Sequence, residues 1–431
     1  MKRKIIEKLV EWKNSKDRKP LVLQGARQIG KTYIVNMFGA EYYSNVLYCN
    51  FEKEEVLKVF FTNLDPKNIL RKLGAYKRKE IIPGHTLVIF DEIQACPEAL
   101  TSLKYFCEEA NEYHIVSMGS LLGVAVHREK FSFPVGKVDF MDMYPMDFEE
   151  FLMATDNDFL IEEIKKCYAE NCPMDRPFHE QAMDLYKTYL FVGGMPEVVD
   201  EYVKSKNNEL VRIKQLAILN SYFDDMGKYN SETEIPKAKL VYRNISTQLA
   251  KENRKFAYSK LKIGGRASEF EKAIEWLGLA GIASRLNRVE QIKLPLNAYQ
   301  SLSDFKFYMN DVGLCVASQD LLFEDIFYEN KDLNDFKGGL AENYVNNQMI
   351  VNGNKCFYWT SGNSAEVDFV TRLNGNIVPI EVKSSDNTRS RSLNEYIKSY
   401  SPMLAYRVSG KNFGLENNIK SVPLYAVFCI K

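Results

Sequence analysis

Apolar residues follow two patterns that alternate through the first third of the chain. Short runs of consecutive apolar residues are typical of parallel strands covered on both faces. Such runs lie in the segments 21–24, 45–51, 87–92 and 114–119. A helical pattern follows the first of them, over 33–38. Strands alternating with helices predict an α/β fold built on a parallel sheet.

The first of these strands runs directly into a glycine-containing loop. The loop matches G-x-x-x-x-G-K-T and consists of Gly25, Ala26, Arg27, Gln28, Ile29, Gly30, Lys31 and Thr32. In such a loop the glycines let backbone N–H groups curl around a phosphate, the lysine reaches the β- and γ-phosphates and the threonine ligates Mg²⁺. A chance match is the alternative, but the preceding strand and the following helix argue against it. The loop therefore predicts binding of ATP with Mg²⁺.

A second strand, 87–92, ends in the acidic pair Asp91 and Glu92. In a P-loop enzyme an acid at this place holds the water shell of Mg²⁺, which is the role we expect for Asp91. Glu92 is then the general base that polarises the attacking water. A strand that only ends in solvated acids is the alternative. Ligands bind at the carboxyl ends of strands in open α/β sheets, so Ser117 or Ser120 is a candidate γ-phosphate sensor or an ordinary loop hydroxyl.

Composition narrows the class of protein. The chain has 431 residues, enough for several domains, and its 57 basic and 57 acidic residues cancel to a net charge of zero. Any contact with nucleic acid must therefore come from a local basic patch. No apolar run is long enough to span a membrane, and the amino-terminal residues lack the apolar core of a signal peptide. Eight scattered cysteines without a C-x-x-C pair favour reduced thiols, and we expect a cytoplasmic protein.

The middle of the chain changes its pattern twice. Residues 151–229 are helical in period, with a break at Gly193-Gly194-Met195-Pro196. Residues 238–300 predict helices followed by a two-stranded hairpin over 281–294, which is the order of a winged helix. Its basic residues are Lys255, Lys260, Lys262, Arg266 and Lys272. These basic residues favour contact with DNA phosphates. The predicted helix over 268–279 also carries Glu269, Glu271 and Glu275, which favour packing against a neighbouring domain instead.

The last hundred residues carry a second group of charged positions. A helix beginning near 336 contains Glu342, and predicted strands follow at 355–360, 365–370 and 377–383. Glu381 and Lys383 share one face of their strand because side chains alternate with period two. Asp368 on the neighbouring hairpin strand can meet them there. Paired structural charges are the alternative, since D…E-x-K is a weak pattern.

The order of these motifs resembles a prokaryotic family of AAA-type ATPases with a C-terminal region long described as of unknown function. The segments that carry the resemblance are 25–32, 87–92, 118–120, 143–152 and 193–197. It implies a helical lid after the core. Family members usually carry Gly-Arg where this chain has Gly136-Lys137. The arginine that stabilises the transition state is therefore not identified, and it is either Arg128 or a residue of a neighbouring subunit. The second alternative implies a homo-oligomer.

The C-terminal pattern resembles the restriction-endonuclease-like, PD-(D/E)xK, nuclease fold. The resemblance implies that Asp368 and Glu381 ligate Mg²⁺ or Mn²⁺, that Glu342 completes the site and that Lys383 activates water. The fold class predicted for the whole chain is α/β multidomain, in four parts. They are the P-loop AAA-type ATPase core (1–155), the helical lid (156–235), the winged helix (236–322) and the restriction-endonuclease-like domain (323–431).

Two functions remain open. The first is an ATP-hydrolysing protein that couples its nucleotide state to a metal-dependent nuclease acting on DNA. The second is a nucleotide-gated interaction or assembly protein whose C-terminal domain is catalytically silent. A small-molecule kinase is disfavoured, because a kinase does not require the additional domains.

Overall fold

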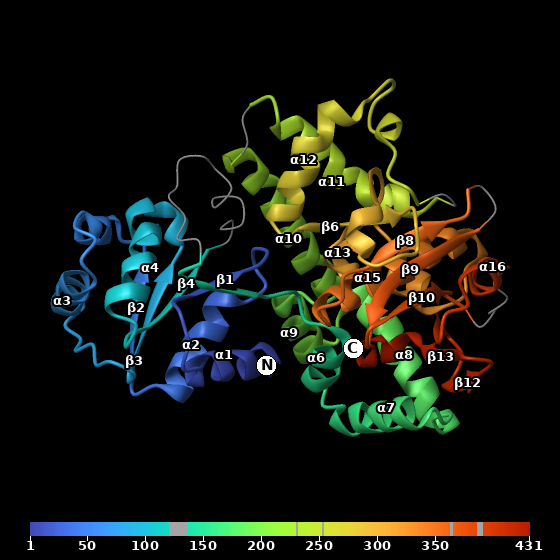
Figure 1. Ribbon diagram of the computed structural model, residues 1–431, viewed down its shortest axis with the longest axis horizontal. Helices are drawn as coiled ribbons and strands as arrows, with labels where there is room; N and C mark the ends of the chain where they lie inside the picture. Colours follow the sequence, from blue (N-terminus) through green and yellow to red (C-terminus); the bar gives the residue numbers. More distant parts are fainter. Residues whose placement is uncertain (120–135, 230–231, 252–253, 363–364, 386–390) are drawn as a thin grey trace. The chain divides into compact units, whose positions relative to one another are not determined.

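The computed structural model describes residues 1–119, 136–229, 232–251, 254–362, 365–385 and 391–431 (Figure 1). The chain divides into two compact units. The N-terminal unit comprises residues 3–144 and 279–281, and the C-terminal unit comprises residues 1–2, 145–278 and 282–431.

A five-stranded parallel sheet forms the centre of the N-terminal unit, in the strand order β2-β3-β4-β1-β5. The strands are β1 (Leu21–Gln24), β2 (Asn45–Asn50), β3 (Thr86–Asp91), β4 (His114–Met118) and β5 (Asp139–Asp142). The four apolar runs are confirmed as strands. Sequence reasoning missed β5, because this edge strand alternates between half-buried and exposed residues and contains no apolar run.

Helices cover both faces of this sheet. On one face Val88 and Phe90 of β3 join an apolar core that includes residues of α3 and α4. On the other face α2 packs closely, since a Cβ on its Gly39 would lie 2.7 Å from the side chain of Val46 and 3.2 Å from that of Leu87. The helical elements are α1 (Ile5–Asn14), α2 (Lys31–Tyr42), η1 (Glu55–Phe61), α3 (Pro66–Lys77), η2 (Ile93–Ala95) and α4 (Pro97–Glu109).

The C-terminal unit begins with helices, as the period of 151–229 predicts. They are α6 (Phe148–Ala154), α7 (Asp158–Glu170), α8 (Arg176–Val192), α9 (Pro196–Ser205), α10 (Asn208–Tyr229) and α11 (Ile235–Leu249). The predicted break lies between α8 and α9. A Cβ on Gly194 would lie 1.9 Å from the Met146 carbonyl oxygen, and the Gly194 N–H donates to Asp311 at 2.6 Å. The backbone therefore approaches so closely here that only glycine fits.

The segment predicted as a winged helix contains its helices but not the predicted hairpin. After η3 (Tyr258–Lys260) and α12 (Ala267–Leu279), only β6 (Ala283–Val289) of the segment 281–294 is a strand. Its antiparallel partner is β7 (Gln300–Met309), reached through η4 (Leu296–Tyr299). The prediction of two strands within 281–294 is therefore wrong. Alternating polarity also occurs in irregular chain, and Pro295 cannot donate to a strand ladder.

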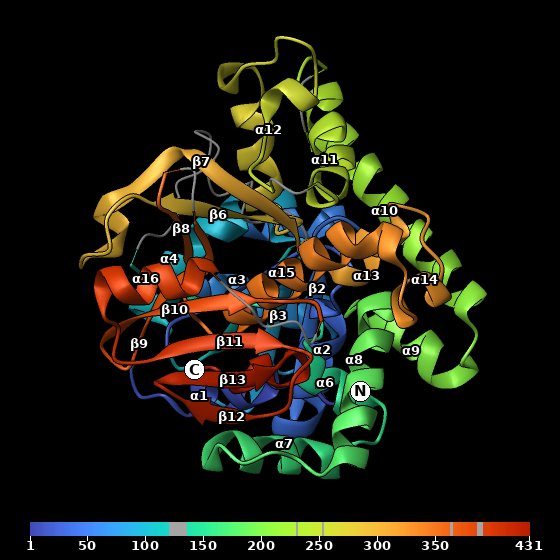
Figure 2. The ribbon, with the colours of Figure 1, turned by 90° about the vertical axis from the view of Figure 1, so that its right-hand side faces the viewer.

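The β6–β7 hairpin belongs to a larger, eight-stranded sheet in the order β12-β13-β11-β10-β9-β8-β6-β7. Its other strands are β8 (Phe357–Thr360), β9 (Glu366–Leu373), β10 (Asn376–Val382), β11 (Ala405–Ser409), β12 (Gly414–Glu416) and β13 (Ile419–Pro423). Figure 2 shows β10, β11, β13 and β12 as successive strands. The three C-terminal strands expected from the sequence are confirmed. The sequence predicts a domain boundary at residue 322, but strands from before and after this residue belong to the same sheet.

Further helical elements complete the C-terminal unit. They are α13 (Val312–Ala317), α14 (Phe323–Phe327), η5 (Lys331–Leu333), α15 (Asn334–Val351), α16 (Arg391–Tyr400) and η6 (Leu424–Cys429). Among the residues that the structure describes, no helix combines the length and apolar character needed to cross a bilayer.

Candidate functional site

The P-loop has an unusual backbone conformation. Gly25, Gln28 and Gly30 have φ angles of +139°, +65° and +89°, in the region that L-residues avoid. A Cβ on Gly25 would lie 2.2 Å from the Met143 carbonyl oxygen, so this position also requires glycine for space. A loop of this kind turns successive N–H groups toward one point, the arrangement that binds phosphate.

Lys31 lies at the start of α2 with its ammonium folded onto the loop. Its Nζ donates to the carbonyl oxygens of Gly25 at 2.8 Å and Ala26 at 2.6 Å. Burial lowers the pKa of Lys31 to about 8, against the opposing effect of Glu92 and Asp91. These carbonyl contacts are ones that a phosphate oxygen can replace with a stronger, charge-assisted hydrogen bond.

Asp91 at the end of β3 is the centre of a polar network. The Thr32 hydroxyl donates to Asp91 Oδ2 at 3.3 Å, although β4 separates β3 from β1 in the sheet. The Tyr48 hydroxyl and Asn50 Nδ2 donate to the same oxygen, the latter at 3.3 Å. Sequence reasoning missed Tyr48 and Asn50. The available signal was their place near the carboxyl end of a strand that pairs with β3 in register, Asn50 opposite Asp91.

Glu92 follows Asp91 in a left-handed conformation, with φ +50°. Its backbone N–H donates to Asp91 Oδ1 at 3.0 Å, and Gln94 Nε2 donates to its carboxylate. Non-glycine residues held in this region of φ are found preferentially at functional sites. Gln94 is a further residue that the sequence did not identify.

The hydroxyl of Thr32 and the carboxylate of Asp91 are hard oxygen donors, which fit Mg²⁺. Nucleotide sites complete the Mg²⁺ shell with phosphates and water, so they need no cage of protein carboxylates. The pair therefore fits the predicted cofactor.

The second candidate site lies on the eight-stranded sheet. Asp368 of β9 accepts a hydrogen bond at 2.8 Å from the backbone N–H of Val382, and Lys383 Nζ lies 2.8 Å from Glu381 Oε1. The β9–β10 register, in which Phe369 faces Ile380, brings Asp368 and Glu381 to adjacent places on the ladder. The hairpin thus brings three of the predicted residues together.

Glu342, on α15, has cationic partners that the sequence did not identify. The Lys306 ammonium lies 2.9 Å from Glu342 Oε2, the Tyr308 hydroxyl donates to the same oxygen at 2.9 Å, and Arg254 pairs with Oε1. Lys306 on β7 has a fully buried side chain and also lies 2.6 Å from Glu366. The signal was the sequence Phe-Lys-Phe-Tyr at 305–308, where period-two alternation sets Lys306 and Tyr308 on one face.

The charges around this carboxylate cluster shift the pKa values of its members. Burial and the neighbouring Glu342 and Glu381 raise the pKa of Asp368 well above its usual value. Burial also opposes ionisation of Glu342, but Lys306 and Arg254 outweigh it and lower the Glu342 pKa. Within the described ranges, no group of three or more His, Cys, Asp or Glu side chains is arranged to hold a metal ion. With Glu342 held by internal cations, the cluster as it stands does not fit a metal.

Comparison with protein families gives three matches, each to part of the chain. Residues 17–152 match a family model described as an AAA domain. The N-terminal segment is an AAA-type P-loop ATPase domain. Residues 183–324 and 337–427 match models described as domains of unknown function (DUF8612 and DUF4143). No curated protein matches this sequence.

Several solved structures are similar to the chain at low identity. A Walker-type ATPase of Pyrococcus abyssi is 14% identical with a TM-score of 0.46, over 73% of this chain and 94% of that chain. ORC1 of Aeropyrum pernix in complex with DNA is 13% identical with a TM-score of 0.28, over 75% and 91%. The RuvB Holliday junction branch migration motor of Thermotoga maritima is 15% identical with a TM-score of 0.28, over 66% and 90%.

The remaining candidates of the ATPase domain have different outcomes. Ser120 and Arg128 lie outside the described residues. Ser117 is fully buried on β4, opposite Val22 and Phe90. Lys137, where the resemblance noted in the sequence leads us to expect arginine, forms an ion pair of 2.9 Å with Glu108. This contact gives Lys137 a structural partner within its own domain.

Proposed function

We propose that the AAA-type domain binds Mg²⁺·ATP and hydrolyses it. The observation that carries the proposal is the meeting of Lys31, Thr32 and Asp91 beside Glu92, from two different strand–loop segments, at one edge of the sheet. The 3.3 Å contact between Thr32 and Asp91 joins the two segments. These residue types supply an ammonium for phosphate, hard oxygens for Mg²⁺ and a base for water.

The residues divide the reaction among them. The P-loop N–H groups and Lys31 bind the phosphates, while Thr32 and Asp91 hold Mg²⁺, which when bound neutralises negative charge on the phosphoryl group. Glu92 orients the attacking water and accepts its proton. Gln94 is a positioning residue, since its amide holds the Glu92 carboxylate. The proposal also includes a lid formed by the helices after residue 155, a homo-oligomer that supplies an arginine, and a cytoplasmic location.

Removing the Lys31 ammonium tests the binding part of the proposal. We expect Lys31→Ala to weaken binding of a fluorescent ATP analogue about 10- to 100-fold, because a charge-assisted hydrogen bond contributes about 1.5–3 kcal/mol. Titration with and without Mg²⁺ measures the effect. Lys104→Ala, at an exposed position of α4, is the matched control and should bind like the wild type. Equal affinities of Lys31→Ala and wild type would contradict the assignment of the loop.

We further propose that the C-terminal unit is a nucleotide-gated interaction module, and its charge-paired core favours binding over cleavage. Lys306 and Arg254 already balance Glu342, and Lys383 balances Glu381. We propose DNA as the partner, contacted through the basic residues of the predicted winged helix and through the C-terminal domain. The proposed restriction-endonuclease-like fold then serves binding rather than cleavage.

A metal-dependent nuclease is the second candidate function. The specific observation in its favour is the grouping of Asp368, Glu381 and Lys383 on one hairpin. A nicking assay on supercoiled DNA with Mg²⁺ or Mn²⁺ separates the two candidates, and we expect no cleavage by the wild-type chain. Cleavage that disappears in Lys383→Ala but persists in Lys355→Ala, an exposed control, would establish the nuclease instead.

A further inference from the structure

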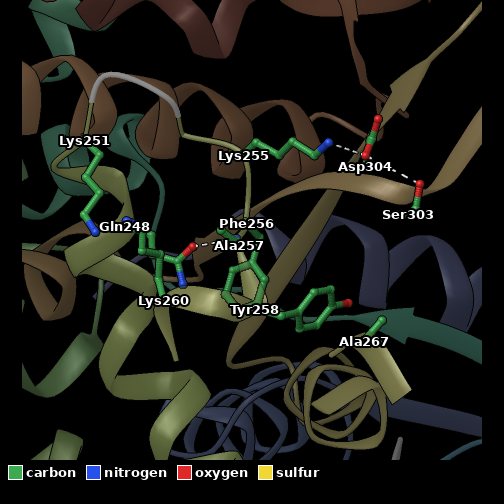
Figure 3. Close-up of a pocket in the computed structure, with 10 residues that line it drawn as sticks. All are labelled: Gln248, Lys251, Lys255, Phe256, Ala257, Tyr258, Lys260, Ala267, Ser303 and Asp304. Atoms are coloured by element: carbon green, nitrogen blue, oxygen red, sulfur yellow. Dashed lines mark hydrogen bonds and ion pairs between the residues drawn. The ribbon is translucent and has the colours of Figure 1, made fainter. Parts of the chain in front are cut away.

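The C-terminal unit contains a cavity that belongs to neither site. Its volume is about 660 Å³, within the range of roughly 300–1,000 Å³ found for small-molecule pockets. It lies between the end of α11, the chain leading to η3, the start of α12 and β7 (Figure 3). The lining residues are Gln248, Lys251, Lys255, Phe256, Ala257, Tyr258, Lys260, Ala267, Ser303 and Asp304.

Among the described residues, the lining of the cavity has more lysines than carboxylates. Three lysines line it against one carboxylate, Asp304. Lys255 pairs with Asp304, and Arg288 lies 3.0 Å from the other oxygen of the same carboxylate. In the described part of the chain, no carboxylate lies within ion-pairing distance of Lys251 or Lys260. The lining therefore favours an anionic ligand.

Gln248 contributes a directed donor. Its side chain is 4% exposed, and its Oε1 accepts a hydrogen bond at 2.8 Å from the backbone N–H of Ala257. That contact fixes the orientation of the amide, so Nε2 is the hydrogen-bond donor that is left for another partner. Across the described ranges, this Nε2 has no hydrogen-bond acceptor. Buried polar groups are normally satisfied, so this donor is a place where an acceptor atom of a ligand would fit.

Aromatic rings form an apolar part of the lining. The half-buried Tyr258 packs edge to face against Phe256, with ring centroids 5.6 Å apart, and Phe256 stacks on Phe305 at 5.3 Å. The Tyr258 hydroxyl donates to Glu271 at 2.9 Å, which holds the ring in place. A fixed aromatic ring beside lysines is the combination on which nucleic-acid bases stack while phosphates meet positive charge.

We infer that this cavity binds one nucleotide unit of a single-stranded nucleic acid. Lys251 and Lys260 meet its phosphates, the base lies against Tyr258, and an oxygen of the unit accepts from Gln248. The inference rests on the proposed nucleic-acid partner and adds a defined site and a strand preference to it. It is independent of ATP hydrolysis and of the carboxylate cluster.

Anisotropy titrations of the full chain with a labelled oligothymidylate of about 12 nucleotides test the inference, since comparable sites span about 4–16 nucleotides. All proteins keep the wild-type P-loop and are titrated both without nucleotide and with saturating Mg²⁺·ATP, because the proposed interaction is nucleotide-gated. We expect Lys251→Gln/Lys260→Gln to weaken binding at least tenfold. The slope of log K against log salt should fall by about 1.4, at about 0.7 per lost phosphate contact.

Gln248→Glu is the second variant, because a carboxylate still accepts from Ala257 but no longer donates. It should also lose at least tenfold in affinity, with thermal unfolding measured in parallel because the buried carboxylate itself costs stability. The control Lys166→Gln/Lys67→Gln removes the same charge from exposed positions of α7 and α3 and should bind like its parent.

Three results would overturn the inference. If the chain bound duplex DNA and both pocket variants behaved like the wild type, nucleic acid would still be the partner, but the cavity would not be its binding site. Failure to bind any strand at low salt would reject both. Displacement of the strand by micromolar thymidine monophosphate would assign the cavity to a free nucleotide.

Discussion

Replacing Lys306 by methionine is expected to lower the free energy of unfolding of the C-terminal unit by about 3–5 kcal/mol, the usual cost of breaking a buried ion pair. Lys306 is fully buried and lies 2.9 Å from Glu342, whose own side chain is 1% exposed. Methionine fills a similar volume, so the loss is electrostatic rather than one of packing. Urea denaturation followed by hydrogen exchange in β9 and β10 measures the change within this unit.

A double variant distinguishes the ion pair from other causes. Lys306→Met/Glu342→Gln should recover part of the loss, since the carboxylate that lost Lys306 is removed as well, whereas Arg254 and Glu366 each still lose one partner. Lys355→Met, at an exposed position, is the single-site control and should change stability by no more than about 0.5 kcal/mol. If the single and double variants were equally unstable, Glu342 would not be the group that Lys306 balances.

Replacing Glu92 by glutamine is expected to slow ATP hydrolysis about 10²- to 10⁴-fold, the usual contribution of a general base. Affinity for ATP should stay close to that of the wild type, because the phosphates are bound by the P-loop and Lys31 rather than by Glu92. Glutamine can still bond to Gln94, so the local structure should persist. Single-turnover hydrolysis and an equilibrium titration measure the two effects separately.

Glu109→Gln removes the same charge from an exposed position at the end of α4 and is the matched control. Its rate of hydrolysis should equal that of the wild type. A Glu92→Gln protein that hydrolyses ATP at the wild-type rate would exclude Glu92 as the base.

The ATPase domain was largely predictable because its chemistry lies in contiguous motifs. The P-loop and Asp91-Glu92 each follow an apolar strand, and the strands predicted from the sequence are present in the sheet. Tyr48, Asn50 and Gln94 were not predictable as site residues. Their roles depend on the strand order, which sets β2 beside β3 in a register that the sequence does not state.

The C-terminal cluster was predictable only within its hairpin. Asp368, Glu381 and Lys383 are close in sequence, and period-two alternation is enough to group them. Arg254 and Lys306 reach Glu342 from distant segments, through packing that no local pattern encodes. The hairpin of β6 and β7 was misplaced for a related reason, because its second strand follows an irregular segment that also alternates in polarity.

Release of inorganic phosphate from ATP by the full chain, with Mg²⁺, is the most direct test of the central claim. The account predicts turnover by the wild type that depends on Mg²⁺ and falls to background in Lys31→Ala, while Lys104→Ala keeps the wild-type rate. Absence of turnover in the wild type, or equal rates in wild type and Lys31→Ala, would contradict it.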